Sequence, residues 1–341
     1  MSHQKPTAIV GVGGYTGQEL VKLVAGHPKL TITGLFGSAS TANQPIEHIA
    51  PALTHIASGT INEGTSEAIA STGAQAAFLA TPHEASVTLA ADLLHHGLTV
   101  VDLSAAFRLS DPSQYPTYYG FDHDWPDLLE SAIYGLPEFD RSRLPGATLI
   151  ASPGCYPTAA ITPLAPLVRG QLIDTARNII IDATSGVSGA GRKASERTSF
   201  CEVSQSPYGV FSHRHQPEID QYTGAPTIFT PHLGPYPRGI CSTIHATLAE
   251  GTTECTAREA LHDAYANEPF VRLLDEGVWP SVAAVAHTNF IDIQIAVKGD
   301  HLIIVACIDN LLKGASGQAV QAFNASMGWD ERLGLLPGAA L

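Results

Sequence analysis

A glycine-rich turn near the start of the chain constrains the fold more than any other feature. The segment "TAIVGVGGYTGQELVKLV" passes from an apolar strand pattern, through four glycines, into a helical pattern. Gly11, Gly14 and Gly17 form a G-x-x-G-x-x-G pattern, and Gly13 adds a closer G-x-G spacing. Such a turn lets a pyrophosphate approach the backbone at the helix N-terminus. The sequence therefore predicts nucleotide binding here; a tight structural turn is the alternative.

The patterns after this turn predict two kinds of sheet. "LTITGLF", "QAAFLA" and "LTVVDLS" are strand patterns, and the helical pattern "EASVTLAADLLHH" separates the last two, as in a parallel sheet built from βαβ units. Further along, "CSTIHATLAE" alternates like a half-solvated antiparallel strand, and "FIDIQIAVKGDHLIIVACIDN" predicts a hairpin that turns at Gly299-Asp300. We therefore expect an α/β fold with a discontinuous Rossmann-type domain at residues 1–151 and 311–341. An α+β domain with a mixed, largely antiparallel sheet would span residues 152–310.

Charge and cysteine usage exclude several classes of function. The net charge of the 341 residues is −14, and no block of Lys and Arg stands out, so we expect neither a nucleic-acid nor a membrane partner. The chain contains neither a signal-peptide pattern nor a run of about 18 apolar residues. The five cysteines are widely spaced and form no C-x-x-C pair, which argues against a disulfide framework and a zinc ribbon. A reduced, cytoplasmic protein is predicted.

The end of the second strand bears on the choice between NAD and NADP. Sites that prefer NAD usually place an acidic residue there, about 20 residues beyond the glycine turn. The segment "LTITGLFGSAS" has no acid, and Ser38 and Ser40 could donate hydrogen bonds to a 2′-phosphate. We therefore predict NADP, although no arginine is present, and two solvated loop serines are the alternative.

The stretch "ASPGCYPTAA" places Cys155 close to a predicted helix start. Pro157 suits the first position of a helix over "PTAAITPLAPLV", so Cys155 would lie just before it. The positive end of the helix dipole lowers a thiol pKa, and nearby N–H groups can stabilise an oxyanion. From this stretch alone, a structural cysteine and a catalytic one are equally plausible.

A second constellation, "FSHRHQPEID", could supply the proton carrier for a cysteine nucleophile. His213 and His215 are two residues apart, with Arg214 between them and Glu218 downstream. An H-x-H pair can bind metal, but no third ligand motif accompanies it, so we predict no metal. An acid or base that works with Cys155 explains one of these histidines better.

Several other residues are candidates for binding the cofactor or an anionic substrate. Arg214 and Arg238 could hold an anion, although either could equally form a surface ion pair. The loop "SGVSGAGRK" could bring backbone close to the nicotinamide, with Arg192 and Lys193 beside it, or be a flexible turn. Asn310 could bond the carboxamide of the cofactor or cap a helix.

Motifs along the whole chain resemble those of one enzyme family. "GVGGYTGQEL", "FLATPHEAS", "VDLSAAFRL", "YGLPE", "PGCYPTAA", "ATSGVSGAGRK", "HRHQPEI", "FTPHLGPYPRGI" and "DNLLKGASGQAVQ" occur in this order. Together they resemble the N-acetyl-gamma-glutamyl-phosphate reductases, NADPH-dependent enzymes of arginine biosynthesis. One departure is that the glycine turn contains G-V-G-G-Y where that family more often has G-A-S-G-Y. We expect the extra glycine to loosen the turn slightly and to leave the pyrophosphate site in place.

The resemblance implies the roles of individual residues. Cys155 would be the nucleophile, and His215, helped by His213, the acid/base. NADP would bind at Gly11, Gly13, Gly14, Tyr15, Thr16, Gly17, Ser38, Ser40, Pro82, Ser188, Gly189 and Asn310. The acyl-phosphate substrate would bind at Arg108, Arg214, Glu218 and Arg238. The chemistry would run through a thioester on Cys155, and the protein would be a homo-oligomer, a dimer or tetramer.

Two other functions remain open at this stage. A related semialdehyde dehydrogenase would act on aspartyl or aminoadipyl phosphate, although the H-R-H-x-P-E-I motif argues against the aspartyl enzyme. A nucleotide-sensing protein without catalytic activity would keep the glycine turn but should lack the nucleophile, and Cys155 is present.

Overall fold

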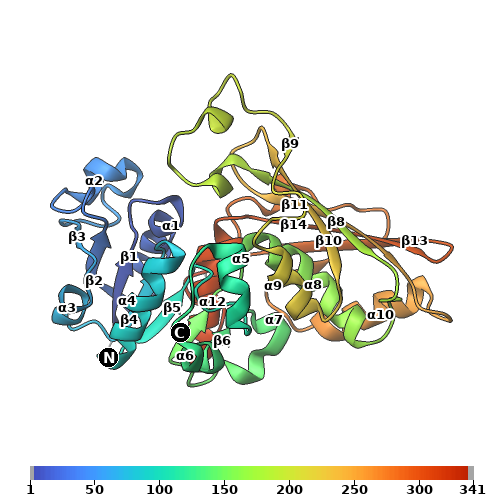
Figure 1. Cartoon of the computed structure of the whole chain (residues 1–341), viewed down its shortest axis with the longest axis horizontal. Helices are drawn as coiled ribbons and strands as arrows, with labels where there is room; N and C mark the ends of the chain where they lie inside the picture. Colours follow the sequence, from blue (N-terminus) through green and yellow to red (C-terminus); the bar gives the residue numbers. More distant parts are fainter. Residues whose placement is uncertain (1–3, 337–341) are drawn as a thin grey trace. The chain divides into compact units, whose positions relative to one another are not determined.

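The computed structural model describes residues 4–336 and divides the chain into two compact units (Figure 1). The first unit takes in Met1–Pro153 and Ala315–Leu341, and the second is Gly154–Gly314. Residues 1–3 and 337–341, which belong to the predicted Rossmann-type domain, lie outside the described residues.

The first unit is built on a seven-stranded sheet in the order β3-β2-β1-β4-β5-β7-β6. Every neighbouring pair in it is parallel. The strands are β1 (Lys5–Val10), β2 (Leu30–Gly37), β3 (Asn62–Glu63), β4 (Ala76–Leu79), β5 (Thr99–Asp102), β6 (Ile133–Tyr134) and β7 (Leu149–Ala151). Strand β2 lies on one side of β1 and strand β4 on the other, so the strand order reverses at β1. Nucleotides bind at such a switch point, beyond the carboxyl ends of the strands.

Helices connect these strands because their apolar residues recur on one face. Helix α1 (Tyr15–Ala25) buries Leu20, Val21 and Val24 and ends at Gly26. The other helices of this unit are α2 (Ile46–Ile49), α3 (Ser66–Ser71), α4 (His83–His95), α5 (Tyr115–Tyr119), α6 (Pro126–Ser131), α7 (Pro137–Asp140) and α12 (Gly317–Ser326). All ten residues of α12 are buried, and its Phe323 packs in the core with Phe78 of β4.

The second unit contains a mixed sheet in the order β12-β13-β14-β11-β8-β10-β9. Two pairs, β12 with β13 and β8 with β10, are parallel, and the other four are antiparallel. The strands are β8 (Ile179–Gly186), β9 (Ser206–Pro207), β10 (Thr227–Gly234), β11 (Ile240–Thr247), β12 (Val271–Leu273), β13 (Ile291–Lys298) and β14 (His301–Ile308). The predicted hairpin is confirmed, with Gly299 at φ +67 in its turn. The predicted fold class, a parallel sheet followed by a mixed and mostly antiparallel one, is also confirmed.

Helices cover one face of this second sheet (Figure 1). They are α8 (Cys155–Arg169), α9 (Gln216–Thr223) and α10 (Glu254–Tyr265), with the short α11 (Val282–Val285) near β14. Between β8 and α9, residues 187–214 form an arm that loops away from the sheet and carries β9 (Figure 1). No helix within residues 4–336 is long and apolar enough to cross a membrane.

Candidate active site

Cys155 is the first residue of the buried helix α8. Gly154 caps the helix, and the Thr158 N–H donates to the Gly154 oxygen, 2.9 Å away. Eleven of the fifteen residues of α8 are buried, so the second unit holds the helix firmly and leaves the Cys155 side chain half-buried at its end. The positive end of the helix dipole there favours a thiolate over a thiol.

The predicted start of this helix is wrong by two residues. Pro157 is the third residue of α8, not the first, and Cys155 lies inside the helix. The first-turn N–H groups of any helix have no partner within it, so a proline is tolerated throughout that turn and does not mark the first residue. A buried carboxylate helps to hold the cap instead: the Gly154 N–H donates to Oε1 of Glu218, 2.8 Å away, and Glu218 is 0% exposed.

The start of helix α9 holds the two histidines close to the start of α8. His215 is the residue before α9, and Glu218 lies in its first turn, so the contact with Gly154 ties the histidines to the start of α8. The rings of His213 and His215 are 4.8 Å apart, and they lie 5.7 and 6.0 Å from the ring of Tyr156, the neighbour of Cys155. The structure thus brings together Cys155, His213, His215 and Glu218.

The two histidines have different surroundings. His213 lies among the rings of Tyr156, Tyr208 and Phe229, and this burial, with the charge of Arg214, lowers its pKa to about 4. Its Nδ1 accepts the N–H of His215, 3.2 Å away, so the proton of the neutral ring is on Nε2. His213 is therefore neutral at pH 7.

Two tyrosines near Cys155 were not predicted from the sequence. The Tyr208 hydroxyl donates to the Tyr156 hydroxyl (3.1 Å), which donates to the His232 oxygen (2.9 Å). Burial raises the pKa of both, and the negative charge of a Cys155 thiolate adds to the effect, so both stay protonated. The two tyrosine hydroxyls near Cys155 are therefore uncharged.

The arm adds a cation that was also missed. The guanidinium of Arg197 lies 4.4 Å from the ring centre of Tyr208, and the charges of Arg197 and Arg214 both act on that tyrosine. Both arginines are exposed. Arg197 lies in "ASERTSF", a segment without a distinctive motif, and only the folded arm relates it to Cys155.

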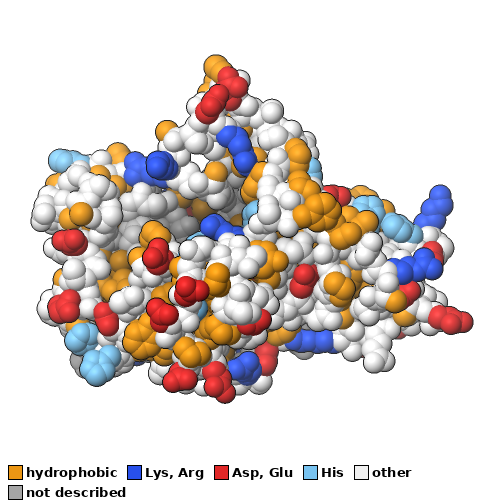
Figure 2. Space-filling view, viewed as in Figure 1, with side chains coloured by type: hydrophobic (Ala, Val, Ile, Leu, Met, Phe, Trp, Pro, Cys, Tyr) orange, Lys and Arg blue, Asp and Glu red, His pale blue; other side chains and the backbone are white. Residues whose placement is uncertain are grey.

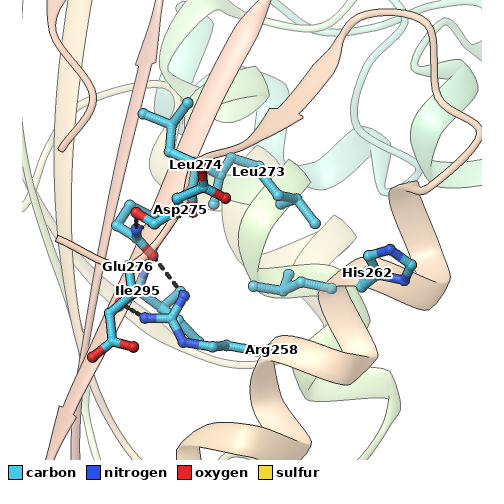
Figure 3. A pocket seen from close by; sticks show the side chains of 10 residues that line it. Arg258, His262, Leu273, Leu274, Asp275, Glu276 and Ile295 are labelled. Atoms are coloured by element: carbon cyan, nitrogen blue, oxygen red, sulfur yellow. Dashed lines mark hydrogen bonds between the residues drawn. The ribbon is translucent and has the colours of Figure 1, made fainter. Parts of the chain in front are cut away.

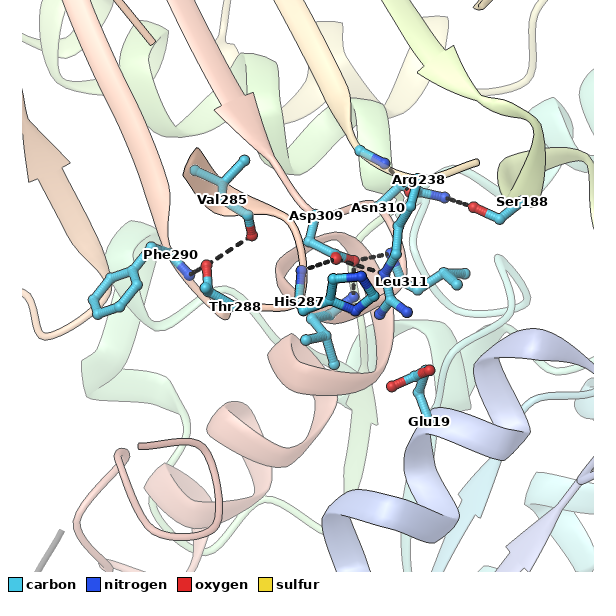
Figure 4. Close-up of polar contacts among 12 residues, drawn as sticks. Glu19, Ser188, Arg238, Val285, His287, Thr288, Phe290, Asp309, Asn310 and Leu311 are labelled. Atoms are coloured by element: carbon cyan, nitrogen blue, oxygen red, sulfur yellow. Dashed lines mark hydrogen bonds and ion pairs between the residues drawn. The ribbon is translucent and has the colours of Figure 1, made fainter. Parts of the chain in front are cut away.

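A buried carboxylate organises the chain after β14, as Figure 4 shows. Asp309 is fully buried and accepts hydrogen bonds from Arg238 Nε (2.5 Å) and from the N–H groups of His287, Leu311 and Leu312. Arg238, predicted to bind substrate, is paired here with Asp309. The pairing could not be foreseen, because Asp309 and Arg238 are far apart in the sequence and meet only through strands β11 and β14.

Asn310 closes the same cluster. Its amide donates to Ser188 Oγ at 2.9 Å, and its oxygen accepts the Gly239 N–H at 2.6 Å. A Cβ on Gly189 would lie 3.7 Å from the Asn310 amide nitrogen. The structure therefore brings together Ser188, Gly189 and Asn310, three residues predicted to bind the cofactor.

Gly314 contacts Cys155 directly and was not predicted. A Cβ built on it would lie 2.8 Å from the Cβ of Cys155 and 3.2 Å from Ile308 Cδ1. The Gly314 N–H donates to the Asp309 oxygen, 2.9 Å away, within the π-helical turn Leu312–Ser316. Only a glycine lets this turn pass so close to Cys155.

The glycine turn of the first unit has the geometry expected of a pyrophosphate site. A Cβ would lie 2.2 Å from the Ala80 oxygen at Gly11 and 2.2 Å from the Gly11 oxygen at Gly17, so both positions require glycine. At Gly13 and Gly14 the nearest atoms would be 3.4 and 3.7 Å away, which is ordinary contact. Because Gly14 caps α1, the amides of Tyr15 and Thr16 lie at its N-terminus. The extra glycine, Gly13, thus lies at a position that also has room for a side chain.

The other predicted cofactor and substrate residues of the first unit lie near the strand ends. Ser38 and Ser40, both exposed just after β2, have their hydroxyl oxygens 2.9 Å apart. Pro82 caps α4 just after β4. Arg108 is 6% exposed and donates to the backbone oxygens of Ser152 and Leu103, at 2.7 and 2.8 Å, which holds the loop after β5.

A pocket and several exposed basic residues lie outside this cluster. A pocket of about 290 Å³ between α10 and β13, shown in Figure 3, contains the side chain of Gln294, which bonds Arg258 and three backbone oxygens. Among residues 4–336, no group of three or more His, Cys, Asp and Glu could hold a metal. Arg192 and Lys193 are exposed, and basic side chains form only small groups on the face in Figure 2.

Comparison with known protein families agrees with this geometry. Residues 6–147 match the model for the semialdehyde dehydrogenase NAD binding domain, and residues 155–310 match that for the semialdehyde dehydrogenase dimerisation domain. The chain belongs to the semialdehyde dehydrogenase family. Its first unit therefore contains an NAD(P)-binding domain.

Curated members of this family cover the chain almost completely. The N-acetyl-gamma-glutamyl-phosphate reductases of Shigella flexneri and of Escherichia coli K12 are each 50% identical over 332 residues, which is 97% of this chain and 99% of theirs. The reductase of Yersinia pestis is 49% identical over the same lengths. The chain belongs with these N-acetyl-gamma-glutamyl-phosphate reductases.

Solved structures share the fold at lower identity. Aspartate semialdehyde dehydrogenase II of Vibrio cholerae, complexed with ASA, superposes with a TM-score of 0.69 at 14% identity, covering 95% of this chain and 98% of that one. A probable aspartate-semialdehyde dehydrogenase of Pseudomonas aeruginosa gives a TM-score of 0.70 at 19% identity, covering 94% and 98%.

Proposed function

We propose that this protein reduces N-acetyl-gamma-glutamyl phosphate to N-acetylglutamate 5-semialdehyde, with release of phosphate, in arginine biosynthesis. One observation carries the chemistry: the thiol of Cys155 lies at the N-terminus of a buried helix whose cap is bonded to the helix that follows the histidine pair. The full-length identity to reductases of this name supports the substrate. The first unit serves to bind the nucleotide, and the second carries out the chemistry.

Cys155 acts as the nucleophile. Its thiolate attacks the acyl-phosphate carbonyl, and the carbon–oxygen bond to phosphate breaks, which leaves a thioester on Cys155. Backbone N–H groups of the first turn of α8 stabilise the oxyanion, because they point out of the helix end. The bound dinucleotide supplies the hydride that reduces this thioester.

His215 is the acid/base, and His213 positions it. His215 donates a proton to the thioester oxygen as the thioester is reduced, which gives the thiohemiacetal hydroxyl. It takes that proton back when the thiohemiacetal collapses, and the Cys155 thiolate leaves as the aldehyde forms. A group that exchanges protons at pH 7 works best with a pKa near 7, and the pKa of His213 is about 4. Burial thus leaves His213 to orient the backbone of His215 through their hydrogen bond.

The matched variants His215→Ala and His213→Ala test this assignment. The first should lower kcat by about 10²-fold or more at an unchanged Kd for the cofactor. The second should lower kcat less, and its pH–rate profile should keep the wild-type midpoint. A larger loss of kcat in His213→Ala would reverse the assignment.

Arg197 and Arg214 are the best candidates to bind the anionic substrate. Both lie close to Tyr208 on the arm, and both are exposed enough to meet a ligand. A guanidinium recognises phosphate or carboxylate by two parallel hydrogen bonds. The pairing of Arg238 with Asp309 and the burial of Arg108 favour structural roles for those two arginines, whereas Glu218 serves the helix cap.

We propose NADP as the cofactor. The pyrophosphate would lie on the turn at Gly13 and Gly14, where added side chains meet no crowding, and Ser38 and Ser40 would bond the 2′-phosphate. Ser38→Asp should weaken NADPH binding at least tenfold and change NADH binding little, because a carboxylate repels the 2′-phosphate. Equal losses for both cofactors would contradict this placement.

The second unit matches a dimerisation domain, and we propose that the protein works as a homo-oligomer, a dimer or tetramer. Sedimentation of the purified protein measures the number of subunits. A nucleophile that must be a free thiol suits the reducing cytoplasm, where we place the enzyme.

The decisive assay is phosphate-dependent reduction of NADP⁺. N-acetylglutamate semialdehyde and aspartate semialdehyde are compared at equal concentration, with and without phosphate. We expect turnover with the first aldehyde, at least 10²-fold faster than with the second, and none in Cys155→Ser, which should still bind NADPH. Equal rates would favour the second candidate, a related semialdehyde dehydrogenase, whose fold the solved structures share.

A further inference from the structure

Two thiols outside the proposed active site face each other across neighbouring strands. Cys241 of β11 is paired with Cys307 of β14 in an antiparallel ladder that runs without a register shift from Ile240↔Ile308 to Thr247↔His301. Both cysteines are free. The proposed mechanism uses neither of them.

The register places this pair where a disulfide fits. The Leu248 N–H donates to the Asp300 oxygen, 2.8 Å away, one step beyond the pair Thr247↔His301. Hydrogen-bonded and non-hydrogen-bonded pairs alternate along an antiparallel ladder. Leu248 and Asp300 form a hydrogen-bonded pair, so the alternation from there back along β11 makes Cys241↔Cys307 a non-hydrogen-bonded pair.

A bond on the other side of β11 agrees. The Gly186 N–H donates to the Gly239 oxygen at 2.9 Å, so the backbone of Cys241 bonds β8 and leaves its β14 side without ladder bonds. Cα atoms in non-hydrogen-bonded pairs are about 4.5 Å apart, and disulfides span about 4.4–6.8 Å. The two sulfurs can therefore be joined without breaking a ladder bond.

The two thiols differ in access. Cys241 is half-buried, whereas Cys307 is fully buried. A hydrogen bond from the Cys307 thiol lowers the pKa of Cys241 to about 7 and raises that of Cys307. Tyr236 and Asp292 also act electrostatically in this cluster, and neither is a cation. A reagent in solution therefore reaches Cys241 first, and the buried Cys307 reacts after it.

We propose that Cys241 and Cys307 form a dithiol site that a low-molecular-weight disulfide converts reversibly into an intramolecular disulfide. The Cys241 thiolate attacks one sulfur of the small disulfide, whose S–S bond breaks, and one small thiol leaves with a proton from water. Cys307 then loses its proton and attacks the Cys241 sulfur, and the second small thiol leaves. Two protein thiols are oxidised, and one small disulfide is reduced to two thiols.

The test uses oxidised glutathione as the probe and the full-length Cys155→Ser variant, so that the proposed nucleophile does not react. After incubation at neutral pH, remaining thiols are alkylated and peptides are mapped by mass spectrometry without reduction. We expect a cross-linked pair of peptides containing Cys241 and Cys307, which dithiothreitol removes.

Two further variants in the same background separate the site from general thiol reactivity. Adding Cys307→Ala should leave Cys241 as a stable mixed disulfide with glutathione, because nothing resolves it. Adding Cys255→Ala, which removes an exposed thiol on α10, should leave the cross-link unchanged. The proposal is overturned if Cys201 and Cys255 become fully glutathionylated while Cys241 and Cys307 are recovered alkylated and unlinked.

Discussion

The close contact between Gly314 and Cys155 predicts that adding a side chain at Gly314 lowers kcat. In Gly314→Ala, the new methyl carbon would lie 2.8 Å from the Cβ of Cys155 and 3.2 Å from its Cα. Carbon atoms pack best at about 3.5–4.0 Å, so the two residues must separate by about 1 Å. Ile308 Cδ1, 3.2 Å from the same methyl group, blocks the easiest direction of relief.

The cost should fall on catalysis more than on folding. Overpacking by one methyl group destabilises a protein by about 1–3 kcal/mol, which a chain of this size can tolerate. A displacement of about 1 Å at a reacting group can cost about 10²-fold in rate. We therefore expect kcat to fall by about 10- to 100-fold while the Kd for NADPH stays within twofold of wild type.

The assay combines turnover with a direct probe of the thiol. Steady-state kcat and the rate of alkylation of Cys155 by iodoacetamide should fall together, with thermal melting measured in parallel. Gly26→Ala is the matched control, because its new Cβ would meet only two backbone oxygens, at 3.5 and 3.9 Å. A kcat for Gly314→Ala within twofold of the control, at an equal melting temperature, would refute the reasoning.

Three further predictions concern stability. His27 is 2% exposed, and its burial lowers its pKa from 6.5 to about 4. Because the unfolded chain takes up the proton first as the pH falls, up to about 3 kcal/mol of stability that is present above pH 6.5 should be lost by pH 4. His27→Gln should flatten this dependence of stability on pH in urea unfolding. Gly17→Ala places a methyl group 2.2 Å from a backbone oxygen and should lower the melting temperature and abolish NADPH binding, whereas Gly14→Ala, with its nearest atom at 3.7 Å, should melt like wild type. Asp309→Asn removes the buried carboxylate that pairs with the partly buried Arg238 and should cost about 3–5 kcal/mol in denaturant unfolding; a loss below about 1 kcal/mol would contradict a structural role for the pair.

The fold was predictable where local patterns agree with the tertiary structure. The strand–glycine–helix segment at Gly11 and the hairpin at Gly299 combine hydrophobic periodicity with turn residues, and both formed as expected. The start of α8 was misplaced, because the cap depends on Glu218, 64 residues away, and a proline is compatible with any position of the first turn. Caps made by distant residues leave no local signal.

The candidate site divides in the same way. Cys155 and the His213/His215 pair carry reactive groups in compact motifs, so they could be named from the sequence. Substrate binding by Arg238 stays a prediction, and its pairing with Asp309, which follows a distant strand, has no local signal in the sequence. Arg197 lies in no motif, and the motif that contains Gly314 does not single out this glycine. Only the fold brings Arg197 close to Tyr208 and Gly314 close to Cys155.

The bond between Gly154 and Glu218 has a consequence for how such an enzyme can change its substrate. It joins the helix that begins at Cys155 to the helix that follows His215, so the proposed nucleophile and the proposed proton carrier belong to one rigid piece. The exposed arginines lie on the arm, which is outside that piece. If the arm binds substrate as proposed, substitutions in it would alter which acyl phosphate is accepted while Cys155 and His215 keep their geometry, so substrate range and chemistry would evolve separately.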